Sequence, residues 1–176
     1  LLVCSSLNRN SGTMVREKTK MEKMLISGVA ADKNVAKIRV AGLGNDPEST
    51  FRLLNLLDRN NLNIDVMIQS LGKDGTKSVS FTVAKPDMLR TIDVLNDNKD
   101  SLGIKKLDYD ENVAKISVIG AGVRSHSGVA AKMFGALANA GINTEMITTS
   151  EIRITALIDE AYADQAMRAI HETFLE

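Results

Sequence analysis

The sequence predicts an α+β protein made of two βαββαβ units, each a four-stranded antiparallel sheet with two helices on one face. Two observations lead to this prediction. Residues 34–42 recur as residues 112–120, with seven of nine positions identical. After each copy, apolar residues first recur at helical spacing and then alternate as they do in strands. A period of roughly 80 residues is too long for a solenoid and indicates two copies of a small domain.

The first copy reads as strand, helix, strand, strand, helix. Its opening strand lies within residues 37–41, where apolar residues alternate with polar ones. Asp46-Pro47-Glu48 then supplies an N-cap, a proline at the first helical position and an acid in the first turn. The other expected elements are strands at 64–69 and 79–83, a helix from Pro86, and a fourth strand at 105–110 that completes the sheet.

The second copy repeats this order but lacks a strand after its last helix. Its helix is expected to open at Ser127-Gly128 and to stop at Gly141. The segment before the first copy, residues 26–32, is the repeat partner of the strand near 107–110. We therefore expect residues 26–31 to pair with residues 116–119, so that the two units interlock.

Composition excludes several classes of function. Hydrophobic residues make up 44% of the 176 residues and aromatic residues only 3%, so the core must be aliphatic and a base-stacking platform is not expected. Lys plus Arg equals Asp plus Glu at 22 each, which removes the basic excess typical of nucleic-acid or acidic-membrane binding. No apolar run approaches the roughly 20 residues of a membrane span.

The few cysteine and histidine residues indicate whether the chain could bind a metal and which cellular compartment it fits. One cysteine and two distant histidines give neither a disulfide framework nor a metal site, and we expect no metal and no cofactor. A single cysteine fits a reducing, cytoplasmic location.

Two glycine-rich loops sit between a strand and a helix. Gly42-Leu43-Gly44 and Gly120-Ala121-Gly122 have the placement of dinucleotide-binding loops, but Pro47 and Ser125 stand where that motif needs a third glycine. Two readings remain for each loop: backbone N–H groups that hold a ligand carboxylate, or a plain tight turn. The phosphate-binding string Gly-x-x-x-x-Gly-Lys-Ser/Thr is also missing, so the chain alone is expected to be non-catalytic.

Five short strings occur along the chain in a fixed order: Ser27-Gly28-Val29-Ala30, Asn63-Ile64-Asp65, Gln69-Ser70, Ser125-His126-Ser127-Gly128-Val129 and Thr149-Ser150-Glu151-Ile152-Arg153-Ile154. Together they resemble the C-terminal regulatory region of aspartokinases, and the resemblance covers nearly the whole chain. It implies tandem ACT domains of ferredoxin-like fold. In that family these domains bind end-product amino acids, threonine or lysine, and inhibit the ATP-dependent phosphorylation of aspartate.

The resemblance also implies an organisation and partners. Residues 1–23 are expected to be the tail of a kinase domain or a linker, 24–33 a strand completing the second unit, 34–111 the first ACT domain and 112–176 the second. A homodimer through the ACT domains and a catalytic kinase domain or subunit are the expected partners. The chain is then either a separate regulatory subunit or part of a longer kinase. The alternatives are a dimerisation module without effector and a small ferredoxin-like hydrolase.

An amino-acid effector needs partners for a carboxylate and an ammonium, and a desolvated charge must be paired. Asp65 and Gln69 are four residues apart on an expected strand and should share one face. Asn45 stands where the family commonly has an acid, so threonine is our first expectation for at least one site. The resemblance implies that a threonine-like effector contacts Gln69 and Asn143, with Ile64 and Thr144 beside it. It implies that a lysine-like effector contacts Ser150 and Glu151, together with Asn45 or Asp46. It also places His126 in the effector loop.

Overall fold

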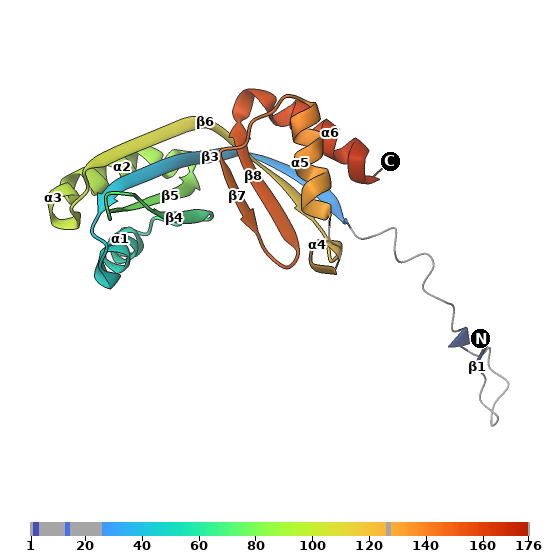
Figure 1. Cartoon of the computed structure of the whole chain (residues 1–176), viewed down its shortest axis with the longest axis horizontal. Helices are drawn as coiled ribbons and strands as arrows, with labels where there is room; N and C mark the ends of the chain where they lie inside the picture. The colour runs from blue at the N-terminus through green and yellow to red at the C-terminus, as the bar shows by residue number, and fades with distance from the viewer. Residues whose placement is uncertain (1, 4–12, 15–25, 126–127, 176) are drawn as a thin grey trace.

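A six-stranded antiparallel sheet forms the centre of the molecule, in the order β4-β5-β3-β6-β8-β7 (Figure 1). The computed structural model describes residues 2–3, 13–14, 26–125 and 128–175. The strands of the sheet are β3 (Gly28–Leu43), β4 (Met67–Leu71), β5 (Lys77–Ala84), β6 (Lys106–Ile119), β7 (Met146–Thr149) and β8 (Arg153–Asp159), and a separate short pair is formed by β1 (Leu2–Val3) and β2 (Thr13–Met14).

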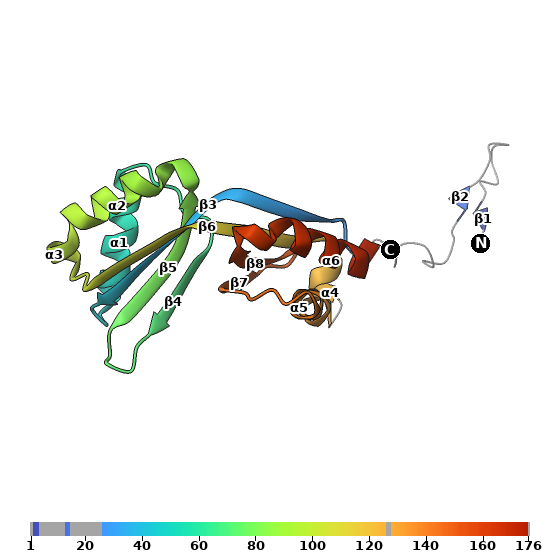
Figure 2. The same ribbon diagram turned by 90° about the horizontal axis from the view of Figure 1, so that it is seen from above.

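Helices cover one face of each half of this sheet (Figures 1 and 2). Among the described residues, every helix is too short or too polar to cross a lipid bilayer. The helices of the first half are α1 (Pro47–Arg59), α2 (Met88–Asp97) and α3 (Lys99–Leu102), and those of the second half are α4 (Gly122–Ser125), α5 (Val129–Asn139) and α6 (Ala163–Leu175). Single 3-10 turns, Lys85–Asp87 and Glu160–Tyr162, precede α2 and α6.

The two long strands β3 and β6 belong to both halves. The first part of β3 pairs with the last part of β6, as Gly28 opposite Ile119 shows, while Val40 pairs with Leu107 near the other ends. This confirms the predicted interlocked topology, in which the early segment closes the second sheet. The two expected four-stranded sheets are continuous, however, because they share β3 and β6.

Both long strands change register where the two halves meet. The irregularity in their pairing falls between Asp32 and Lys37. At this point the Asn34 N–H donates to Asp32 Oδ1 at 2.9 Å, and the Asn112 N–H donates to Asp110 Oδ1 at the same distance. The repeated Asp-x-Asn sequence therefore gives both strands the same local turn of the backbone.

Three apolar clusters fill the interior. One lies under the helices of the first half, around Phe81 and Leu95, and a second lies under those of the second half, around Met133 and Ile170. A third, smaller cluster sits between the halves and contains Val35, Val66, Val113, Met146 and Leu157. The scarcity of aromatic residues explains why these clusters are almost entirely aliphatic.

The helices α1 and α5, which hold equivalent places in the two halves, end in the same way. After α1, Asn61 has a φ of 52° and the Leu62 N–H donates to Leu57 O at 3.0 Å. After α5, the predicted stop at Gly141 is confirmed by its φ of 71°, and the Ile142 N–H donates to Leu137 O at 2.9 Å. Both are Schellman ends, which turn the chain back toward the sheet and the site.

Candidate functional site

The lysine of each repeated Asn-Val-Ala-Lys segment pairs with an acid from the other copy. Lys37, in the first copy, forms an ion pair with Glu145 of the second. Lys115, in the second copy, forms one with Asp65 of the first, and it also contacts Asp32 at 3.0 Å. Because Asp65 and Glu145 occupy equivalent positions, these pairs join the two halves with approximate twofold symmetry.

The environment of Lys115 favours its charged form. Partial burial alone would lower its pKa, but hydrogen bonds and charge from Asp65 and Asp32 outweigh that effect and raise the pKa above its ordinary value. Burial would likewise raise the pKa of Asp32, yet the bonds from Lys115 and the Asn34 N–H lower it overall. The cluster therefore holds one ammonium between two carboxylates, with one net negative charge.

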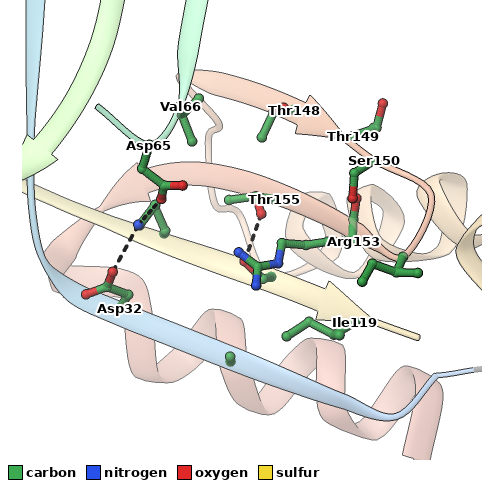
Figure 3. A pocket seen from close by; sticks show the side chains of 13 residues that line it. Asp32, Asp65, Val66, Ile119, Thr148, Thr149, Ser150, Arg153 and Thr155 are labelled. Carbon is green, nitrogen blue, oxygen red and sulfur yellow. Dashed lines mark hydrogen bonds and ion pairs between the residues drawn. The ribbon is translucent and has the colours of Figure 1, made fainter. Parts of the chain in front are cut away.

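A cavity of about 470 Å³ opens on the helix-free face of the second half (Figure 3). Its floor includes Ser117 and Thr155, whose hydroxyls lie 2.8 Å apart. The Lys115 cluster stands at one end, and Arg153 reaches over the sheet toward Thr155 from the other (Figure 3). Among the described residues, Arg153 has no carboxylate partner. The other residues that line the cavity are Ala30, Val66, Ile119, Thr148, Thr149, Ser150 and Ile152.

A second cavity, of about 300 Å³, adjoins the first along the seam between the halves. It brings the predicted residues Ile64 and Asp65 together with Asn63 and Asn34. Asp32, Asp65 and Lys115 line both cavities, so the ion-pair cluster forms the wall between them.

Asp65 and Gln69 do not share a face, contrary to the prediction. The strand β4 begins only at Met67, after a bend at Asp65. Asp65 turns toward Lys115 of the other half, whereas Gln69 Oε1 accepts from the Thr50 hydroxyl of α1 at 2.6 Å. Strand alternation holds only within a regular strand, which explains the error.

In the loop between β3 and α1, the side chain of Asp46 caps the start of the helix. Asp46 Oδ1 accepts from the Ser49 N–H at 2.8 Å and from the Glu48 N–H at 2.9 Å, and Asp46 Oδ2 accepts from the Ser49 hydroxyl. These bonds, chiefly that from the hydroxyl, lower the pKa of Asp46. Lys77 Nζ donates to Asp46 O at 2.7 Å, and Asn45 lies exposed beside this cap.

The predicted residues of the second half lie in different places. Asn143 and Thr144 line a third cavity, of about 370 Å³, beside Phe134 at the end of α5. Ser150 lines the 470 Å³ cavity and forms a backbone bond to Arg153 O at 2.7 Å. Glu151 pairs at 3.0 Å with Arg124, and both side chains are mostly exposed. His126 lies outside the described residues.

Sequence reasoning missed several residues that build the cavities: Asp32, Lys115, Ser117, Arg153 and Thr155. A usable signal existed for one of them, because Lys115 and Lys37 are identical in the repeat and each lies between an alanine and an isoleucine. In the part of the chain that the structure describes, no group of three His, Cys, Asp or Glu residues is arranged to hold a metal ion.

Comparison with known proteins agrees with this architecture. A model of the ACT domain matches residues 116–174. The chain is 36% identical over 177 residues to an aspartokinase of Pseudomonas aeruginosa and 39% identical over 180 residues to one of Helicobacter pylori. It aligns over 99% of its own length with both, but over only 43% and 44% of theirs. The chain thus spans less than half of these relatives.

Two solved structures match over nearly their full length. A structure of aspartokinase alpha and beta subunits has a TM-score of 0.80 and 42% identity, and the match covers 86% of this chain and 99% of that one. The ligand-free regulatory subunit of aspartate kinase from Thermus thermophilus has a TM-score of 0.80 and 33% identity, covering 85% and 99%. With its two interlocked βαββαβ halves, the chain belongs to the ACT-domain regulatory subunits and regions of the aspartokinase family.

Proposed function

We propose that this chain is an allosteric module that binds an end-product amino acid, threonine or lysine, and thereby inhibits ATP-dependent phosphorylation of L-aspartate by an aspartokinase. The observation that supports this most is the seam between the halves. Asp65, a predicted effector residue of the first copy, is ion-paired there with Lys115, and Glu145 of the second copy is ion-paired with Lys37. A ligand that competes for either acid changes the contact between the halves, which is the kind of coupling that allosteric control requires.

The catalytic part is proposed to be a separate kinase domain or subunit. The relatives are aspartokinases that extend well beyond the matched region, since the match covers 43% of the Pseudomonas aeruginosa protein. We propose that residues 1–23 continue toward that part. The 176-residue chain alone should then transfer no phosphate from ATP to aspartate, and turnover in a preparation free of any kinase would contradict this assignment.

We further propose a homodimer that forms through the edge strands of the sheet. β4 and β7 are the two edges, and they carry exposed apolar side chains at Met67, Leu71 and Ile147. Exposed edge strands are usually covered, and pairing with a second copy covers both the backbone groups and these side chains. Such pairing also places the segments that begin at Asn63 and Asn143 close to a second chain.

Calorimetric titration with threonine and with lysine tests the effector proposal. We expect saturable binding of at least one of them to the dimer. Gln69→Ala should weaken threonine binding by about ten- to a hundredfold, because losing a hydrogen bond to a charged group of the ligand costs roughly 1.5–3 kcal/mol. Unchanged unfolding of the variant serves as the control for its fold.

Two results would overturn the effector proposal. One is the lack of binding of either amino acid to the wild-type dimer. The other is an unchanged rate of aspartate phosphorylation when the effector is added to the complex of this chain with its kinase part.

A further inference from the structure

The 470 Å³ cavity on the helix-free face has an uneven charge distribution. At one end, Lys115 lies between Asp32 and Asp65, and the three groups carry one net negative charge. At the other end stands Arg153, which has no carboxylate partner among the described residues (Figure 3). The cavity volume falls within the roughly 300–1,000 Å³ typical of small-molecule sites.

The cavity exists because the second half carries small side chains where the first half carries large ones. On β3 and β6, Ala30 stands opposite Ser117 in the second half. At the equivalent pair of the first half, Arg39 stands opposite Asp108. The small pair leaves open space over the sheet, and the guanidinium of Arg153 lines that space.

The groups around this space suit a small zwitterion. A guanidinium forms two parallel hydrogen bonds with a carboxylate, and the hydroxyls of Ser117 and Thr155 lie on the floor beside it. Asp65 and Asp32 already surround an ammonium, that of Lys115, so their geometry fits an ammonium-bearing ligand. Ile119 and Ile152 add apolar surface for a side chain near the Arg153 end.

We propose that this cavity is a second amino-acid site, which takes the ligand carboxylate on Arg153 and the ligand ammonium at the Asp32–Asp65 end. The inference rests on the proposed function for the choice of an amino acid as ligand. It does not use Gln69 or Asn143, so the two sites can be tested apart.

The test is a titration of the full 176-residue chain with L-threonine, followed by amide NMR shifts at Ser117, Arg153 and Thr155. Isobutyrate and isobutylamine, which carry only one of the two charges, serve as comparison probes. We expect L-threonine to shift these amides at concentrations at least tenfold below those that either probe requires.

Two variants remove the site by different means. Arg153→Ala deletes the carboxylate anchor, and Ser117→Arg fills the space with the residue that the first half carries at this position. Each should weaken the binding reported by these amides at least tenfold. Arg124→Ala is the matched control, because Arg124 is an exposed arginine of the same half that pairs with Glu151 outside the cavity. It should leave this binding unchanged.

The outcomes separate this inference from the proposed effector residues. Binding that Gln69→Ala weakens but Arg153→Ala and Ser117→Arg leave intact overturns the cavity site alone. Binding that only the cavity variants weaken supports the cavity and overturns the assignment to Gln69. No binding of threonine in any titration, with lysine also inactive, overturns both.

Discussion

In the first half of the molecule, Arg39 and Asp108 face each other on the helix-free side of β3 and β6, whereas Ser117 and Ala30 do so in the second. The buried side of the same strands differs much less: Ile38 and Ile116 are both fully buried. The two halves thus keep one core pattern while their open faces have diverged. This contrast shows that the two copies keep matching residues on the core side of these strands and differ on the open side.

The starts of the equivalent helices α1 and α5 also differ between the halves. In the first half, Asp46 caps α1 with its own carboxylate. In the second half, α5 follows Gly128, which has a φ of 107° and offers no side-chain cap. The carboxylate of Asp46 therefore accepts hydrogen bonds from the first N–H groups of α1. The cap residue of α5 is a glycine, which supplies no such bond.

The largest expected effect tests the shared core. Leu57 and Leu137 occupy equivalent positions and are 2% and 1% exposed. Leu57→Ala and Leu137→Ala should each lower the free energy of unfolding by about 2–5 kcal/mol, because each leaves a cavity in a packed cluster. Urea denaturation measures this. Leu89→Ala, at a position that is 67% exposed, is the control and should change it by less than about 0.5 kcal/mol. If one of the two leucine variants loses much less unfolding free energy than the other, the two cores are not equivalent.

The next effect tests the difference between the loops. Asp46→Ala should lower the free energy of unfolding by about 0.5–2 kcal/mol through loss of the N-cap, while Asp46→Asn should retain most of it. Thermal unfolding of both variants checks this. If Asp46 serves an effector instead, Asp46→Ala will weaken amino-acid binding and leave unfolding unchanged.

The smallest effect concerns the seam and its pH dependence. Because the pKa of Asp32 is lower in the folded chain than the usual 3.8, its contribution to stability is present above pH 3.8 and is lost as the pH falls through the lower, folded value. Asp32→Asn should therefore lower the free energy of unfolding by no more than about 1 kcal/mol near neutral pH, and the difference should vanish in acid.

Asp110→Asn is the matched control for this comparison. Asp110 accepts the same backbone bond, from the Asn112 N–H, but lacks an ion pair among those described. Its effect on the free energy of unfolding near neutral pH should be smaller than that of Asp32→Asn. An equal loss in the two variants at neutral pH would contradict the role assigned to the contact between Asp32 and Lys115.

Much of the fold could be predicted because repeated local patterns encode it. The repeat gave the number of units, and the missing last strand led to the pairing of residues 26–31 with 116–119. The site was harder to predict, since it depends on side chains that cross between the halves. A bend turns Asp65 away from Gln69, and nothing local to Lys115 reveals that its partner lies in the other copy.

The long shared strands also impose an order on synthesis at the ribosome. The part of β3 from Gly28 onward emerges early, but its partners in β6, around Ile116 and Ile119, are made more than eighty residues later. At about 5–20 residues per second, this strand waits roughly 4–18 seconds with its hydrogen-bonding groups unpaired. The first half can assemble during that interval, since β5 and the early part of β6 precede the late strands. The second half has to close over a segment that left the ribosome before any of its other strands.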